Sequence, residues 1–411
     1  MATPAWSEPA TLPTVSTNGW YGLQSNKVVH SYTVGSYHGF ASSVVKLEFK
    51  SVIVDGIRPV NQKLETELMC FSQIAFAAML LLAGLARAED DLRVADLGDC
   101  QLDSGETISE CIVAYRVLGK LNAEESNILV FPTGYDGSTE DLVTYGYIGP
   151  GKMADSDSYH VIAIEAFGNG LSSSPSNSTS QRGDSFPVMS VRDMVRAQHR
   201  LLTEKLGFKH VNTVMGASMG GMQVFEWITT FPVFMDNAVP IEGTPWPTAY
   251  DLMLWSAWLD AIDTDKGDVD SNTRAARLLT ALDGLTLWTP EYFNGMVEAD
   301  KFTDFFDGFS SGIRGQDFAN RRAQTVAVLS HDISKPFTDF ENNAASIIKA
   351  RTLVVGFDSD HMVNPVPSMQ LAKMIGAEVL LIEGNCGHMA PNPDCAQAEV
   401  ASAIHKFLSK E

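Results

Sequence analysis

The chain has 411 residues, which is enough for one large α/β domain carrying an inserted subdomain. Apolar residues make up 45% of it and charged residues 19%, proportions typical of a soluble globular protein. The formal net charge of −21 argues against binding to nucleic acid or to an anionic membrane, because both need a basic surface.

The first 68 residues differ in character from the rest. Scattered Ser, Thr, Gly and Pro separate weak strand-like patches, such as residues 44–54. These patches do not join the strand and helix pattern of the later chain. We therefore expect residues 1–68 to form no structured domain, and we interpret them as the product of an upstream start codon.

An uncharged apolar segment follows at residues 74–85. It is too short to span a bilayer and fits the core of a signal peptide, and an A-x-A cleavage site follows at 86–88. Met69 stands at the right distance upstream to be a start. Residues 69–88 are thus predicted to be a secretory signal, which makes 89–411 the mature, secreted or periplasmic chain. The alternative is a short core helix, since no Lys or Arg lies between Met69 and the apolar run.

Four cysteines follow the predicted cleavage site, an even number that suits an oxidising compartment. Cys100 and Cys111 flank an expected hairpin turn, and Cys386 and Cys395 bracket a loop with a histidine. These pairs form either two local disulfides or four buried free thiols. No C-x-x-C or His-Cys cluster indicates zinc, and we expect no metal site.

Strand and helix patterns alternate beyond residue 97. Residues 97–119 read as paired antiparallel edge strands. The alternation that follows predicts a mostly parallel, doubly wound sheet. Buried strands are expected near 128–131, 161–165, 211–215, 237–241, 351–355 and 379–383, and helices over 190–206, 219–230 and 394–408.

A Gly-rich turn follows the strand that ends near Phe131. A Gly-rich loop just after a buried strand can supply one backbone amide to an oxyanion hole. We assign that role to the amide of Thr133 (or Gly134), together with the amide of Met219. The alternative is an ordinary tight turn.

Residues 215–222 have the form of a nucleophile elbow. An apolar strand precedes Ser218 and a helix-compatible run follows it, with Gly216 and Gly220 on either side. Such glycines let the backbone pass close to its neighbours, so the serine is lifted above the sheet with a helix N-terminus beneath it. Ser218 is predicted to be a catalytic nucleophile.

The strand pattern stops between about residues 244 and 335, where aromatic residues gather. This insertion is interpreted as a helical cap over the active site. An aromatic lid favours a substrate with an apolar portion, although the same aromatics would equally form the core of the cap. The aromatic residues are Trp246, Trp255, Trp258, Trp288, Tyr292, Phe293, Phe302, Phe305, Phe306 and Phe309.

A serine nucleophile needs a base and an acid, which follow it in the order Asp, then His. His388 lies on a Gly-flanked loop after the last strand and is the predicted base. Asp360 and Asp358 both follow the strand before it and compete for the acid role. All of them lie past the carboxyl ends of strands, where open α/β sheets carry their sites.

With these residues in place, the chain resembles the homoserine O-acetyltransferase family of α/β-hydrolases from about Leu97 onward. The resemblance implies an α/β-hydrolase fold, a Ser-His-Asp acyl-enzyme mechanism and frequent dimerisation. In that family the acid is the second Asp of the Asp-Ser-Asp turn, which favours Asp360. The matching segments are 114–119, 131–134, 148–151, 167–170, 191–195, 216–223, 358–360 and 387–388.

Two positions depart from that family. The resemblance implies an Asp directly after the catalytic His for the amino group of homoserine, and this chain has Met389 there. It implies an Arg for the carboxylate, and alignment by eye places Trp246 at that position. Because unpaired charges in a pocket are unfavourable, the acyl-transfer chemistry is expected to be retained and the acceptor to differ.

The leading hypothesis is a secreted serine acyl-transfer enzyme that acts on a small-molecule ester or thioester. It needs no cofactor, binds neither nucleic acid nor membrane after signal cleavage, and is a possible homodimer. The second hypothesis is a homoserine O-acetyltransferase with acetyl-CoA as co-substrate. The third is a non-catalytic binding protein, since a fold does not fix a function.

Overall fold

The structure, a computed structural model, describes residues 30–37, 44–51 and 92–410. The chain divides into two units, Met1–Leu82 and Ala83–Glu411. No helix in the described ranges is long and apolar enough to cross a membrane.

The first unit contains a hairpin of strands β1 (His30–Tyr37) and β2 (Val44–Ser51). The strands pair antiparallel along their whole length. This hairpin differs from the expectation that 1–68 lacks structure. The rest of that segment and the whole predicted signal peptide, 69–88, lie outside the described residues.

The second unit is built around an eight-stranded sheet with the spatial order β14-β13-β12-β11-β7-β10-β6-β3. The six strands from β14 to β10 run parallel, and β6 pairs antiparallel with both β10 and β3. The strands are β3 (Arg93–Asp96), β6 (Ile112–Leu118), β7 (Ile128–Pro132), β10 (His160–Ile164), β11 (Val211–Ala217), β12 (Met235–Ile241), β13 (Arg351–Phe357) and β14 (Glu378–Ile382).

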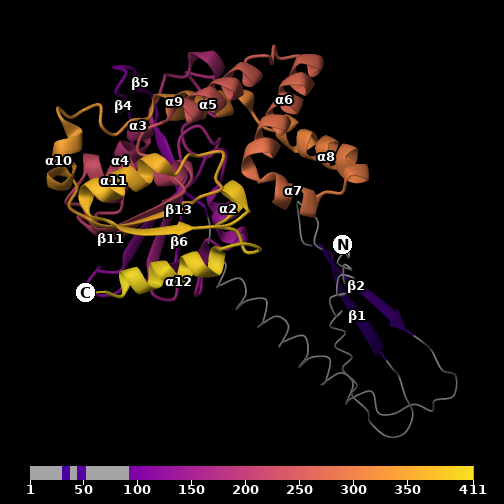
Figure 1. Ribbon diagram of the computed structural model, residues 1–411, viewed down its shortest axis with the longest axis horizontal. Helices are drawn as coiled ribbons and strands as arrows, with labels where there is room; N and C mark the ends of the chain where they lie inside the picture. The colour runs from indigo at the N-terminus through magenta and orange to yellow at the C-terminus, as the bar shows by residue number, and fades with distance from the viewer. Residues whose placement is uncertain (1–29, 38–43, 52–91, 411) are drawn as a thin grey trace, which may run out of the picture. The chain divides into compact units, whose positions relative to one another are not determined.

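Helices cover both faces of this sheet. Successive strand residues point to opposite faces, so Val130 packs in the core beneath α3, α4 and α11, whereas Leu129 packs in the core beneath α2 and α12. Figure 1 shows α12 (yellow) on the opposite side of the sheet from α4 and α11. The predicted doubly wound α/β-hydrolase fold is confirmed. The flanking helices are α2 (Thr139–Thr144), α3 (Val191–Arg200) with the π-helical turn η2 (Leu201–Lys205), α4 (Met219–Thr230), α10 (Phe340–Ile347), α11 (Val366–Ile375) and α12 (Gln397–Leu408).

The predicted insertion between β12 and β13 is helical. Four of its aromatic residues pack against one another, namely Trp288, Phe293, Phe305 and Phe309, with ring centroids 5.4–6.1 Å apart. These four half-buried rings therefore pack on one another within the cap, whereas Trp255 and Trp258 are buried in the main core. The cap helices are α5 (Ala249–Ile262), α6 (Val269–Leu287), α7 (Pro290–Met296), α8 (Phe302–Arg314) and α9 (Phe318–Ser330).

Two short-range disulfides close loops of the second unit. Cys100 in strand β4 (Cys100–Gln101) bonds to Cys111, beyond the turn that leads into strand β5 (Thr107–Ile108). Cys386 bonds to Cys395 across the loop that carries His388. Both pairings predicted from the sequence are confirmed. A second small sheet pairs β8 (Ile148–Gly149) with β9 (Ala154–Asp155), and the single turns η1 (Gly183–Ser185), η3 (Ala299–Lys301) and η4 (Gly387–Met389) complete the fold.

Candidate active site

Ser218 lies between the end of β11 and the start of α4, with φ of 56°. This left-handed conformation is uncommon for a residue other than glycine. A Cβ on Gly216 would lie 2.5 Å from the carbonyl oxygen of Gly220, and one on Gly220 would lie 2.7 Å from that of Pro132. The close backbone passage expected of a nucleophile elbow is therefore present.

His388 links Ser218 to Asp360 in one chain of hydrogen bonds. Its Nε2 lies 2.9 Å from Ser218 Oγ, and its Nδ1 lies 2.7 Å from Asp360 Oδ2. The other Asp360 oxygen accepts the amides of Met362 and Val363, which fixes the carboxylate. The competing Asp358 is exposed and accepts the amide of Gly384. The structure thus brings Asp360 to His388 and leaves Asp358 as a turn residue.

The charge of Asp360 changes the proton affinity of His388. Burial by itself disfavours the imidazolium, but the negative charges of Asp360 and Glu242, with the hydrogen bond from Asp360, raise the His388 pKa from 6.5 to about 9. An imidazolium at this position is therefore well stabilised.

One of the two predicted oxyanion amides differs by one residue in the structure. The amide of Thr133 donates to the carbonyl of Ile164 and is committed to the sheet. Gly134 is next along the chain and lines the cavity, and a Cβ there would lie 3.8 Å from Ser218 Cβ. Met219 is the first residue of α4, so its amide has no acceptor within the helix. We therefore assign the first oxyanion amide to Gly134 in place of Thr133, and we keep the amide of Met219 as the second.

A cavity of about 500 Å³ opens above Ser218 and His388. Met389 lies in its wall, as predicted. Trp246 does not; it packs on Phe340, at 6.4 Å between ring centroids, and lines a separate cavity. The alignment that placed Trp246 at the substrate is wrong, because Trp246 packs against Phe340 of α10 and lies outside this cavity. The apolar wall consists of Met219, Met222, Trp255, Trp258, Leu287, Phe309, Ile313, Val328, Met362 and Val363.

Charged residues that the sequence analysis missed also line this cavity. Arg321 from α9 is buried, with Nη2 3.3 Å from Asp283 Oδ2 of α6. Arg321 Nε and Asp283 Oδ1 have no hydrogen-bond partner among the described residues. Nearby, burial raises the pKa of Asp136 to about 6, although the charge of Arg321 opposes the rise. Nothing in their local sequence marks these residues, because they come from separate helices and a loop.

The cap holds the oxyanion loop in place. The Tyr135 hydroxyl lies 2.7 Å from Thr325 Oγ1, and the Asp136 amide donates to Gln324 Oε1 at 2.8 Å. The Tyr135 ring stacks on Trp258 at 5.3 Å. Cap helices α5 and α9 therefore contact the segment that carries the Gly134 amide.

Glu242 is a further cavity residue that sequence reasoning missed. It is buried directly after β12, and its Oε2 lies 3.8 Å from His388 Nδ1. Its position just past a buried strand is the signal that pointed to Asp360, so the same rule would have found it.

Comparisons with known proteins show the family to which this fold belongs. A sequence model of the alpha/beta hydrolase fold matches residues 127–391. Ethyl acetate hydrolase from Pseudomonas veronii is 32% identical over 293 residues, which are 68% of this chain and 84% of that protein. A homoserine O-acetyltransferase from Geotalea daltonii is 30% identical over 333 residues, 71% of this chain and 90% of that protein.

A solved structure is also similar. The acetyl esterase MekB superposes with a TM-score of 0.72 at 28% identity, covering 78% of this chain and 98% of its own. This chain therefore belongs to the α/β-hydrolase-fold family, as an enzyme of the group that contains homoserine O-acetyltransferases and esterases.

Proposed function

We propose that this enzyme hydrolyses small-molecule esters through an acyl-enzyme formed on Ser218. The observation that carries the proposal is the unbroken contact from Ser218 Oγ through His388 to Asp360 Oδ2. A nucleophile, a base and an orienting acid in that arrangement are what serine acyl transfer requires.

The geometry supports a two-step mechanism. Ser218 Oγ attacks the ester carbonyl carbon while its proton passes to His388 Nε2. The tetrahedral oxyanion receives hydrogen bonds from the amides of Gly134 and Met219. His388 then gives its proton to the leaving alcohol, and the acyl group stays on Ser218. Water then attacks the acyl-enzyme while His388 Nε2 takes one of its protons. The bond between the acyl carbon and Ser218 Oγ breaks, His388 returns the proton to Oγ, and the carboxylic acid leaves the regenerated enzyme.

The cavity and the relatives support a short, largely apolar ester. Two similar proteins are named for ethyl acetate and acetyl ester hydrolysis. Methionine and tryptophan side chains form much of the wall near Ser218, and Met389 places a thioether directly after His388. Such a surface favours apolar acyl and alcohol groups over charged ones.

Acyl transfer to an amino-acid-like acceptor is the second candidate. Arg321 offers a cation for a carboxylate, while Asp136 and Asp283 offer anions for an ammonium group. We rank it lower because Arg321 is already paired with Asp283. Homoserine with acetyl-CoA is the corresponding substrate pair, as in the Geotalea daltonii relative.

Purified full-length protein should be assayed with p-nitrophenyl esters of increasing acyl length, beside acetyl-CoA with homoserine. Ester hydrolysis should exceed homoserine acetylation, and S218A or H388A should each lower kcat by about 10⁴-fold or more. Asp358→Asn is the matched control for Asp360→Asn, and only D360N should reduce kcat strongly. Efficient homoserine acetylation would favour the second candidate, and full activity of S218A would overturn the mechanism.

Export is a further part of this proposal. Two disulfides lie in the described part of the chain, and disulfides persist chiefly in oxidising compartments. They support the secreted or periplasmic location predicted from residues 69–88.

A further inference from the structure

A second carboxylate faces the imidazole of His388. Glu242, Asp360 and His388 each present one oxygen or nitrogen atom within 4.8 Å of the others. Asp360 Oδ2 takes the short contact with Nδ1, and Glu242 Oε2 lies 3.8 Å from the same nitrogen. The mechanism described above uses only the first of these two carboxylates.

No hydrogen bond within the described part of the chain explains a carboxylate at position 242. Glu242 Oε2 has no hydrogen-bond partner among the described residues, and the residue is only 6% exposed. An unpartnered buried carboxylate opposes folding. The backbone is also in the left-handed region, with φ of 42°, and is fixed there by the Glu242 amide donating to Val355. Such features concentrate at functional sites.

The groups around Glu242 favour its protonated form in the resting enzyme. Burial and the charge of Asp360 raise the Glu242 pKa from 4.5 to about 8, although a protonated His388 opposes this. The other titratable group that faces it is Tyr147, whose own pKa is raised by burial and by the Glu242 charge.

We propose that Glu242 is a positioning residue for His388. Its carboxylate can accept the hydrogen bond from His388 Nδ1 in place of Asp360. This inference rests on the proposed function, since it assigns His388 as the base. In the intact enzyme Glu242 ionises above about pH 8, and its charge then adds to the stabilisation of the imidazolium. When Asp360 is neutral, the nearby like charge is gone, Glu242 ionises more readily, and its free oxygen orients the ring.

A double-mutant cycle tests the proposal with p-nitrophenyl acetate as substrate. Glu242→Gln keeps the shape of the side chain and removes the charge. Alone, E242Q should lower kcat by less than about 5-fold, with little change in KM. In the D360N background E242Q should lower kcat by a further 50-fold or more, which is about ten times its effect alone. Equal effects in the two backgrounds would overturn the proposal.

The pH profile supplies a second readout that a purely structural role would not move. Removing the Glu242 charge should lower the His388 pKa, so the acid limb of kcat/KM in E242Q should shift to lower pH. If the double variant does not fold, this shift decides the question. An unshifted limb in folded E242Q contradicts the proposal.

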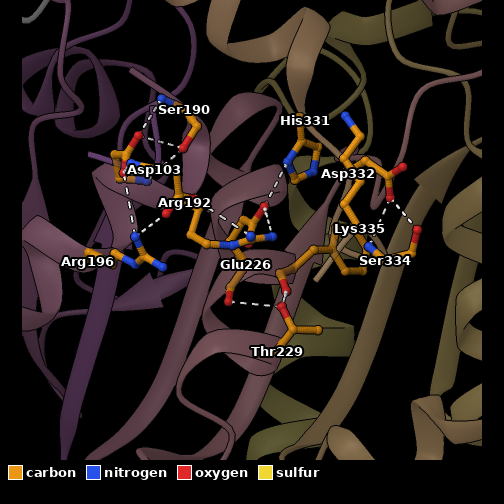
Figure 2. A network of polar contacts seen from close by, with 12 residues as sticks. Asp103, Ser190, Arg192, Arg196, Glu226, Thr229, His331, Asp332, Ser334 and Lys335 are labelled. Carbon is orange, nitrogen blue, oxygen red and sulfur yellow. Dashed lines mark hydrogen bonds and ion pairs between the residues drawn. The ribbon is translucent and has the colours of Figure 1, made fainter. Parts of the chain in front are cut away.

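Glu226 offers a matched control. Figure 2 shows this buried residue of α4 beside Arg192 and His331, with its Oε1 3.4 Å from His331 Nδ1. E226Q should lower stability without coupling to D360N. The S218A variant distinguishes a failure of this inference from a failure of the proposed function. If S218A retains turnover, the proposed function fails. If S218A is inactive and the effects of E242Q and D360N are additive, only the role of Glu242 is rejected. Loss of activity with a chelator, restored by zinc, would instead identify the three-residue cluster as a metal site and overturn the proposal.

Discussion

At the scale of single residues, His388 combines two opposing demands. It must be neutral to accept the proton of Ser218, yet the anions beside it favour its protonated form. Burial opposes protonation and the charges of Asp360 and Glu242 outweigh it, so the His388 pKa is raised to about 9.

We therefore expect kcat/KM for ester hydrolysis to rise with pH through the neutral range and to level off near pH 9. D360N should move this limb to lower pH, because the largest charge that stabilises the imidazolium is removed. Steady-state rates across the pH range test the prediction. A rate that is already constant above about pH 7.5 would contradict it, because the base would then have its ordinary pKa of about 6.5.

Glu242 also makes stability depend on pH. Its pKa is about 8 in the folded chain and ordinarily 4.5, so between these values the folded state binds more protons than the unfolded state. Stability should then fall as pH rises through that window, with a limiting slope of about 1.4 kcal/mol per pH unit. Denaturant unfolding of the wild type and E242Q at several pH values should show a shallower slope for E242Q. Parallel slopes would show that Glu242 does not titrate in this window.

At the scale of elements, loops and caps position the reacting groups. The turn that carries His388 contacts the cap directly, since a Cβ on Gly387 would lie 2.7 Å from the carbonyl oxygen of Leu287. Thr289 Oγ1 also donates to the Asn385 carbonyl in that turn. The Cys386–Cys395 disulfide closes the same loop, whereas Cys100–Cys111 lies at the far edge of the sheet.

Serine replacement of each cysteine pair separates stability from catalysis. Both double variants should lose roughly 2–3 kcal/mol of stability, as short closed loops do. Only the Cys386→Ser, Cys395→Ser variant should also lose kcat, by about 10-fold or more, because the His388 loop is then less well fixed. Thermal unfolding and kcat measured on the same samples provide the test. Equal kcat in both variants would show that the bridge does not position His388.

At the scale of the whole molecule, the sheet and the cap together form the site. The parallel strands bring Ser218, Asp360 and His388 to one edge, and the cap supplies part of the cavity wall. The two disulfides need oxidising conditions to form.

Expression from Met69 with the native leader should yield an exported protein whose first residue is Glu89. The physical basis is the apolar run followed by small residues at the cleavage site. N-terminal sequencing of the exported fraction, with non-reducing peptide mapping, checks both processing and disulfides. An uncleaved cytosolic product would reject export and strengthen the acetyl-CoA hypothesis.

The sequence by itself determined the features that depend on local spacing. Small residues around Ser218 specify the elbow, because only they allow the close passage of β11 and α4. The alternation of buried strands and amphipathic helices specifies the doubly wound sheet, and its strand ends locate Asp360 and His388. The paired cysteines are near neighbours in sequence, so their bridges follow from the loops that they flank.

Only the tertiary structure decided which groups meet across long sequence separations. It showed that the Thr133 amide is taken by Ile164 and that Trp246 turns away from the cavity. It also brought Arg321 to Asp283 from separate helices, and Glu242 to within 3.8 Å of His388 across 146 residues (388 − 242). Periodicity records which face of an element is buried, but the partner of a buried polar atom depends on how the elements pack.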